Sequence, residues 1–162
     1  MPVRPARVPD DVPAVRDLFR AYAAGLGIDL CFQSFEAELA GLPGAYAPPA
    51  GRLLVADAGT ELAGCVALRL HAVGVGEVKR LYVRPEFRGR GLGRELINRI
   101  VAEAEAAGYR ELVLDTLPVM GEAIALYRSA GFVETEPYTL NPVPGALYFR
   151  RPLTTRTPRV TP

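Results

Sequence analysis

The chain has 162 residues, of which 49% are hydrophobic and 23% charged, and its formal net charge at pH 7 is +1. This length and balance are typical of one globular domain with a sizeable core, and the scattered basic residues give no indication of a nucleic-acid partner. No apolar run is long enough to cross a membrane, and the polar N-terminus does not read as a signal peptide. We therefore expect a cytoplasmic protein with neither a nucleic-acid nor a membrane partner.

The predicted elements alternate between strands and helices. The first helix has apolar residues at helical spacing, Asp10 or Asp11 as its N-cap, and Gly25 and Gly27 at its end. Strands are predicted from apolar and β-branched runs separated by turns. In chain order we expect a strand over 3–6, a helix ending near 24, a helix over 35–42, strands over 52–56, 62–70 and 76–83, a helix over 92–107, a strand over 112–115, a helix over 120–130, and strands over 132–135 and 146–150.

This order of elements predicts an α/β protein with a mixed sheet. The short connections between residues 52 and 83 favour an antiparallel meander, and the later strands alternate with helices. We expect a single domain over residues 1–150. Residues 151–162 contain Thr, Pro and Arg with little apolar content, which is typical of a flexible C-terminal tail.

The most informative segment is the glycine-rich stretch Arg88-Gly89-Arg90-Gly91-Leu92-Gly93. It lies between a predicted strand and the first turn of a predicted helix, where backbone N–H groups have no partner within the helix. The helix dipole adds partial positive charge there, and glycines let a ligand approach the backbone closely. Together with the charge of Arg94, these features predict a site for a phosphate or a pyrophosphate.

Two common phosphate-binding loops do not fit this segment. A Walker loop places Lys and then Ser or Thr after its last glycine, whereas Arg94 and Glu95 follow here. The dinucleotide fingerprint needs Gly-x-Gly-x-x-Gly, and the three glycines have a different spacing. The pattern Gln/Arg-x-x-Gly-x-Gly/Ala does fit, through Arg88, Gly91 and Gly93. An arginine-rich turn that happens to precede a helix is the alternative at this point.

That third pattern is the pyrophosphate loop of the GNAT (Gcn5-related) N-acetyltransferases, and the chain resembles this superfamily. A second motif, Ala123-x-x-Leu126-Tyr127-x-x-x-Gly131-Phe132, is similar to the downstream helix of the family. The two motifs occur in the family's order, and the resemblance extends over residues 2–150. It implies the GNAT fold, in which a mixed, mostly antiparallel central sheet is flanked by helices. It also implies acetyl-CoA as cosubstrate.

The resemblance also implies roles for individual residues. In the family, the strand before the loop separates from its neighbour, and its backbone pairs with the pantetheine arm and can bind the developing oxyanion. The resemblance places Tyr127 at the position of the family's general acid. A phenol with a pKa of about 10 can donate a proton to a thiolate, which suits that role. The alternative is that Tyr127 is simply an aromatic residue of the core. The residues expected to bind acetyl-CoA are Leu81, Tyr82, Val83, Arg88, Gly89, Arg90, Gly91, Leu92, Gly93 and Arg94.

Glu77 begins the strand before the loop, where some family members carry a general-base glutamate. A partly buried carboxylate there is expected to have a raised pKa suited to accepting a proton from the amine, and an exposed strand-end charge is the alternative. Strict alternation would put Glu77, Lys79, Leu81 and Val83 on one face of the strand, although a β-bulge would change that assignment. Lys79 and Arg80 are candidates to bind an acidic group on the substrate.

Other positions bear on specificity. Substrate selectivity in the superfamily lies in the first helices and in a late loop, which here makes Phe32, Gln33, Glu36 and Tyr138 candidate substrate-binding residues. Many relatives carry Asn seven residues before the tyrosine, and Met120 occupies that position here.

The two cysteines and the single histidine belong to no recognisable motif. Cys31 and Cys65 have no metal-binding spacing, so we expect reduced thiols and no metal in the reaction. The single histidine, His71, is expected on the surface.

The sequence therefore predicts an acetyl-CoA-dependent N-acetyltransferase that moves an acetyl group to a primary amine of a small molecule, by direct transfer in a ternary complex. A protein N-terminus or lysine as acceptor and a longer acyl chain are alternatives within the same fold. A non-catalytic acyl-CoA-binding regulatory module is the alternative outside enzymes. The protein is expected to be a monomer or a homodimer.

Overall fold

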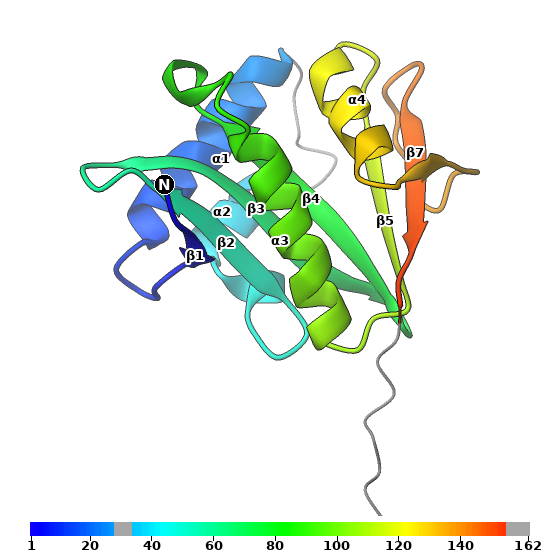
Figure 1. Cartoon of the computed structure of the whole chain (residues 1–162), viewed down its shortest axis with the longest axis horizontal. Coiled ribbons are helices and arrows are strands. Elements are labelled where there is room, and N and C mark those ends of the chain that lie inside the picture. Colours follow the sequence, from blue (N-terminus) through cyan, green and yellow to red (C-terminus); the bar gives the residue numbers. More distant parts are fainter. Residues whose placement is uncertain (28–33, 155–162) are drawn as a thin grey trace, which may run out of the picture.

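The computed structural model describes residues 1–27 and 34–154 (Figure 1). Four α-helices and seven strands make up the described part, with two 3₁₀ turns, η2 (Gly44–Tyr46) and η3 (Pro85–Phe87). The helices are α1 (Val12–Leu26), α2 (Phe35–Ala40), α3 (Leu92–Ala106) and α4 (Gly121–Ser129). The strands are β1 (Val3–Pro5), β2 (Arg52–Asp57), β3 (Leu62–Ala72), β4 (Val75–Val83), β5 (Glu111–Thr116), β6 (Val133–Glu134) and β7 (Leu147–Pro152).

The strands form one sheet in the order β1-β2-β3-β4-β5-β7-β6. Each neighbouring pair is antiparallel except β4 and β5, which are parallel because α3 crosses over between them. The expected mixed, mostly antiparallel α/β sheet is therefore confirmed.

Helices cover both faces of the sheet. The apolar stripe of α3 packs on one face together with Tyr127 of α4, and α1 and α2 pack on the other face (Figure 1). Strand β2 lies between these layers, so Leu54 and Ala56 belong to the core under α3, whereas Leu53 and Val55 belong to the core under α1. This two-sided burial explains why the strand reads as a continuous apolar run.

The sheet splits between its two parallel strands. The ladder between β4 and β5 covers only Val75–Glu77 opposite Glu111–Val113, whereas β5 pairs with β7 on its other edge along its whole length. Figure 1 shows the two strands meeting at one end and diverging toward the start of α3 and α4. The second half of β4 therefore has one edge that β5 does not pair with, which opens a cleft in the middle of the sheet.

A β-bulge in β4 overturns the strict alternation expected from the sequence. Arg80 has a φ of 61°, and the register between β3 and β4 shifts there. The thiol of Cys65 donates a hydrogen bond to the Arg80 carbonyl at 3.3 Å. Because of the extra residue, Arg80 shares the α1/α2 face with Lys79, while Leu81 packs toward α3. The bulge thus places consecutive cationic side chains on one face.

Some predicted boundaries differ from the observed ones. Asp11 is the N-cap residue of α1, as one of the two predicted candidates, but its carboxylate accepts hydrogen bonds from the Arg7 N–H and the Arg4 guanidinium and caps no helical N–H. Helix α1 includes Gly25 and ends against Gly27, whose φ is 66°. Strand β7 continues to Pro152, two residues beyond the expected domain end. Within residues 1–27 and 34–154, no helix is long and apolar enough to span a membrane.

Candidate active site

The turn between β4 and α3 presents a row of free backbone donors. Gly89 and Gly91 have φ values of 80° and 75°, which suit glycine and wind the chain into the start of α3. Within the described part of the chain, the consecutive N–H groups from Gly89 to Arg94 donate no hydrogen bond, and no side chain caps the helix. A Cβ added at Gly89 or Gly91 would meet nothing within 4 Å, so the space above both is open. The turn can therefore bind an anion through its backbone.

A groove of about 720 Å³ extends from this turn into the split of the sheet. Three segments line it: the end of β4, the loop with the first turn of α3, and the start of α4. Its lining residues are Leu81, Tyr82, Val83, Phe87, Arg88, Gly89, Gly91, Leu92, Gly93, Arg94, Val119, Met120, Gly121, Glu122, Ala123 and Leu126. The groove contains all of the expected acetyl-CoA-binding residues except Arg90.

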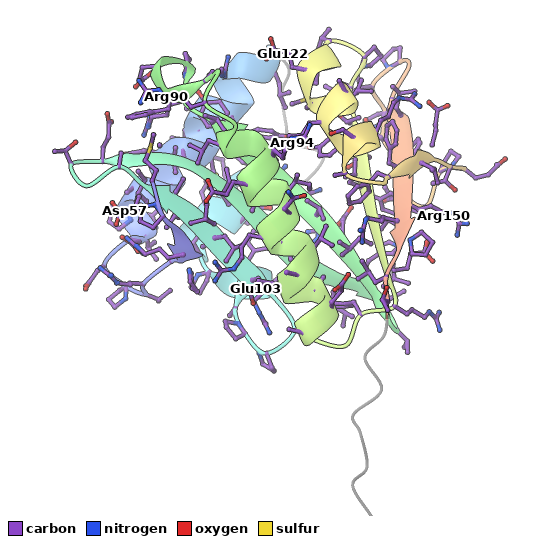
Figure 2. The ribbon with its side chains drawn as sticks, viewed as in Figure 1. Asp57, Arg90, Arg94, Glu103, Glu122 and Arg150 are labelled. Atoms are coloured by element: carbon purple, nitrogen blue, oxygen red, sulfur yellow. The ribbon has the colours of Figure 1, made fainter. Side chains whose placement is uncertain are left out.

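The arginines of the loop differ in what they contact. Nε of Arg88 donates a hydrogen bond to the Val83 carbonyl at 2.9 Å, which ties the loop to the end of β4. Figure 2 shows Arg94 on the side of α3 that faces α4, and Arg90 farther out along the loop. The Arg90 guanidinium lies over the Phe87 ring, 5.8 Å from its centre. Arg88 and Arg94 are therefore the cationic side chains that a ligand in the groove would meet.

Tyr127 lies in the core under α3 and is not among the residues that line the groove. Its ring packs on Phe132 and Phe149, and burial raises the pKa of its hydroxyl, with further contributions from Tyr22 and Asp115. Within the described residues, the Tyr127 hydroxyl has no hydrogen-bond partner. It is not fully enclosed by protein, so it remains accessible to a small ligand or to water. The ordinary phenol pKa expected for this residue is wrong, and the hydroxyl stays protonated throughout the neutral pH range.

Glu77 is buried in a polar cluster on the α1/α2 face of β4. Its Oε1 accepts a hydrogen bond from Nε of Arg69 at 2.8 Å, and its Oε2 accepts one from the Tyr138 hydroxyl at 2.7 Å. Desolvation would raise the pKa of Glu77, but Lys79, Tyr138 and Arg69 together outweigh it, and the net pKa is lowered. The expected raised pKa is therefore wrong, because both carboxylate oxygens are already held by donors.

Because both oxygens of Glu77 accept hydrogen bonds, we expect this residue to position Arg69 and Tyr138 and not to accept a proton. Glu77→Gln is expected to raise the KM for the acceptor about tenfold, because a neutral amide holds Arg69 and Tyr138 less well than a carboxylate does. The pH dependence of kcat between pH 6 and 9 is expected to stay unchanged, and steady-state rates measure both quantities. A large fall in kcat that higher pH restores would instead identify Glu77 as the base.

The same carboxylate predicts how stability depends on pH. A carboxyl whose folded pKa is below its ordinary value of 4.5 stabilises the fold above that pH and loses this contribution as pH falls through the folded pKa. The Tm of the wild type is therefore expected to fall more steeply below pH 4.5 than that of Glu77→Gln. Calorimetric scans between pH 7 and pH 3 would show this, and parallel curves would contradict it.

Arg80 forms a buried ion pair with Glu38. Its Nε and Nη2 donate hydrogen bonds to the two oxygens of Glu38 at 2.9 and 3.1 Å, and its guanidinium lies over the rings of Tyr22 and Phe35. Its side chain is 1% exposed. The pair connects the bulge of β4 to α2, so Arg80 acts as a link between elements, with no exposed face for an acidic group on the substrate.

The remaining sequence candidates are spread over the molecule. Tyr138 joins the cluster, and its ring packs edge-on against His71, which is exposed as expected. The side chain of Glu36 is 80% exposed, outside the cluster, near Arg20. Phe32 and Gln33 lie outside the described residues.

Sequence reasoning missed Arg69 and Glu38. Arg69 stands opposite Glu77 in the β3–β4 hairpin, so the hairpin register carried a signal for it. Glu38 is brought in by the packing of α2, for which no local sequence pattern exists. Among the described residues, no group of three or more potential metal ligands is present.

A split sheet with a turn of free backbone N–H groups at its open end defines an α/β protein with room for an elongated ligand that carries an anionic group. The model of the Acetyltransferase (GNAT) family matches residues 13–132. The chain therefore belongs to the GNAT acetyltransferase family, and it is an acyltransferase.

Individual relatives agree with this assignment. An uncharacterized N-acetyltransferase of Schizosaccharomyces pombe is 44% identical over 147 residues, which cover 89% of this chain and 90% of that protein. The IAA acetyltransferase of Azospirillum brasilense is 41% identical over 109 residues, covering 66% and 71%. A GNAT-family acetyltransferase structure from Staphylococcus aureus has a TM-score of 0.78 at 14% identity and covers 94% of this chain and 99% of its own, which shows the shared fold.

Proposed function

We propose that this protein transfers an acetyl group from acetyl-CoA to a primary amine of a small molecule, by direct transfer in a ternary complex. The observation that carries the proposal is the row of free N–H groups from Gly89 to Arg94 at the open end of the split sheet. Family membership supports acetyl-CoA as the occupant of the groove. The open space above Gly89 and Gly91 fits a pyrophosphate, because no side chain stands between it and the backbone.

Different segments of the groove would bind different parts of acetyl-CoA. The backbone of the Gly89–Arg94 segment and the side chains of Arg88 and Arg94 would hold the pyrophosphate. The edge of β4 from Leu81 to Val83 would accept and donate hydrogen bonds along the pantetheine arm, because β5 does not pair with this part of the strand. In this proposal, the acyl end would lie inside the cleft that the split in the sheet opens.

Acetyl-CoA supplies an activated thioester. The nitrogen of a neutral amine forms a bond to the carbonyl carbon, the C–S bond breaks, and the proton lost by the nitrogen passes through water to the leaving thiolate. A backbone N–H of the unpaired β4 edge would stabilise negative charge on the carbonyl oxygen. The Tyr127 hydroxyl would donate a hydrogen bond to the leaving sulfur. Because its pKa is raised well above that of a thiol, stabilising the thiolate is a larger part of its role than complete proton transfer.

A small acceptor is supported by the enclosure of the polar cluster. Glu77, Lys79 and Arg80 are all buried; Glu38 of α2 holds Arg80, and Tyr138 holds Glu77. Direct transfer is supported by the thiol of Cys65, whose pKa burial raises to about 12, so it is a poor nucleophile. Protein acceptors, longer acyl chains and pure binding remain the competing functions.

Thiol release from acetyl-CoA, measured against a panel of small amines and peptides, tests the proposed function. Release that depends on a small amine, with the N-acetyl product identified by mass spectrometry, is the expected result. Turnover only with peptides would replace the small-molecule acceptor by a protein acceptor. Tight acetyl-CoA binding without turnover on any amine would favour a regulatory module.

A further inference from the structure

The ammonium of Lys79 is buried, and its ion pair among the described residues is a long one, with Glu77. The Lys79 side chain is 6% exposed, and its nearest carboxylate oxygen is Oε2 of Glu77, at 4.0 Å. That oxygen already accepts a short hydrogen bond from the Tyr138 hydroxyl. Among the described residues, Nζ of Lys79 makes no hydrogen bond. A buried cation in this state is unusual, because desolvation is normally compensated by a paired carboxylate.

The neighbouring charges are already matched to one another. Glu38 takes both of its hydrogen bonds from Arg80, and Arg69 holds the other oxygen of Glu77. Asp115, on β5, accepts a hydrogen bond from the Asn141 side chain at 3.0 Å. Among the described residues, Lys79 is therefore the cation on this face of β4 that donates no hydrogen bond to a carboxylate, and it shares Glu77 with Arg69.

The environment of Lys79 disfavours its charge in the free protein. Desolvation lowers its pKa most, Glu77 and Asp115 act in the opposite direction, and Arg80 and Arg69 lower it further. An anion beside Nζ would restore the pKa and replace the lost hydration. The atom can be reached, because it is not among the fully enclosed side-chain atoms that lack a partner.

We propose that Lys79 binds a carboxylate on the acceptor, so that the acceptors of this enzyme are small amines that carry a carboxylate, on the scale of an amino acid. This inference rests on the proposed acetyl transfer and names its substrate class. Lys79 is a specificity-determining residue, and Arg69 supports it by keeping Glu77 occupied.

The position of Lys79 on β4 sets the size of the acceptor. Leu81, which lines the groove, is two residues further along the chain, at most roughly 7 Å away because the bulge at Arg80 shortens the strand. The amine must reach the thioester beside this part of β4 while the carboxylate meets Nζ of Lys79. A carboxylate only a few bonds from the amine satisfies both conditions, whereas a long polyamine without an acidic group leaves Lys79 unpaired.

Matched acceptor pairs test the inference. The twenty standard L-amino acids are each compared with their primary amides, in which the carboxylate is replaced by a neutral carboxamide. For the best acceptor, wild-type kcat/KM for the acid is expected to exceed that for the amide at least tenfold. Equal rates for acid and amide, or transfer only to amines without a carboxylate, would overturn the inference while leaving acetyl transfer intact.

Lys79→Met keeps the apolar stem and removes the charge. It is expected to lower kcat/KM for the acid about tenfold or more, mainly through KM, and to leave the amide nearly unchanged. Lys79→Arg is expected to retain part of the preference for the acid. Arg99→Met, which removes a 44% exposed cation on α3, is the matched control and should behave as wild type. Equal losses of kcat for acid and amide would instead assign Lys79 to proton transfer.

Because Lys79 is the only lysine of the chain, its NMR signal can report directly whether the acceptor binds beside it. With ¹³C at the lysine Cε position, the protein gives one lysine Cε signal, that of Lys79. Adding the best acid is expected to shift this signal and raise the titration midpoint of Lys79, while adding its amide is not. An unchanged signal at saturating acid would contradict the contact. Calorimetry with acetyl-CoA on each variant separates this failure from a failure of the proposed function or of folding.

Discussion

Tyr127→Phe is expected to lower kcat about a hundredfold or more while leaving the Kd for acetyl-CoA within about twofold of wild type. The hydroxyl is the only group removed, and it would no longer donate a hydrogen bond to sulfur as the C–S bond breaks. The ring keeps its contacts with Phe132 and Phe149, so binding and folding should be preserved. Single-turnover rates and calorimetric titration measure the two quantities.

A comparison variant separates the loss of the Tyr127 hydroxyl from a general effect on the core. Tyr109→Phe removes a phenol hydroxyl that donates to the Ala50 carbonyl at 2.6 Å, outside the groove. It is expected to lower Tm slightly and to keep wild-type kcat. A Tyr127→Phe enzyme with wild-type turnover would end the role assigned to the hydroxyl, and Tyr127 would then be a core aromatic.

The double variant Arg88→Ala/Gly91→Ala is expected to weaken acetyl-CoA binding about a hundredfold. Loss of Arg88 removes a charge-assisted contact and frees the loop from the Val83 carbonyl. At Gly91, a Cβ would occupy the open space where the pyrophosphate approaches, and the φ of 75° costs a non-glycine residue about 1 kcal/mol. Calorimetric titration with acetyl-CoA measures the change in Kd.

Arg150→Ala is the control for the lost charge. Arg150 is 46% exposed on β7 and is not among the residues that line the groove, so its removal should leave the Kd unchanged (Figure 2). Arg88→Lys keeps the charge without the planar fork and is expected to fall between wild type and Arg88→Ala. An equal loss in Arg150→Ala would mean that overall charge, and not the loop, determines binding.

The elements and the binding turn could be predicted because their signals are local. The helical period of Leu92, Leu96 and Ile100 determines which face of α3 is buried, and these residues lie in the core as expected. The spacing of Gly89 and Gly91 predicts a turn, and both have the positive φ that such a turn needs. The mixed sheet and the separation of β4 from its neighbour followed from the family resemblance, whereas the parallel pairing with β5 was not predicted.

The chemistry of the polar cluster could not be predicted because it depends on tertiary contacts. The bulge at Arg80 requires the register of β3 against β4, and it moves the Arg80 and Leu81 side chains to faces opposite those expected from simple alternation. The pKa of Glu77 depends on Arg69 and Tyr138, which are 8 and 61 residues away in the sequence. The sequence of the Glu77 strand alone therefore cannot show that Arg69 and Tyr138 hydrogen-bond to Glu77.

Calorimetric titration of the wild-type protein with acetyl-CoA, with desulfo-CoA and inorganic pyrophosphate as comparison ligands, tests the central claim most directly. Saturable binding of acetyl-CoA at one site, competed by desulfo-CoA and lost in Arg88→Ala/Gly91→Ala, is the expected result. Absence of binding by a folded wild-type protein, or binding that the double variant retains in full, would contradict the assignment of the groove and the acetyl transfer built on it.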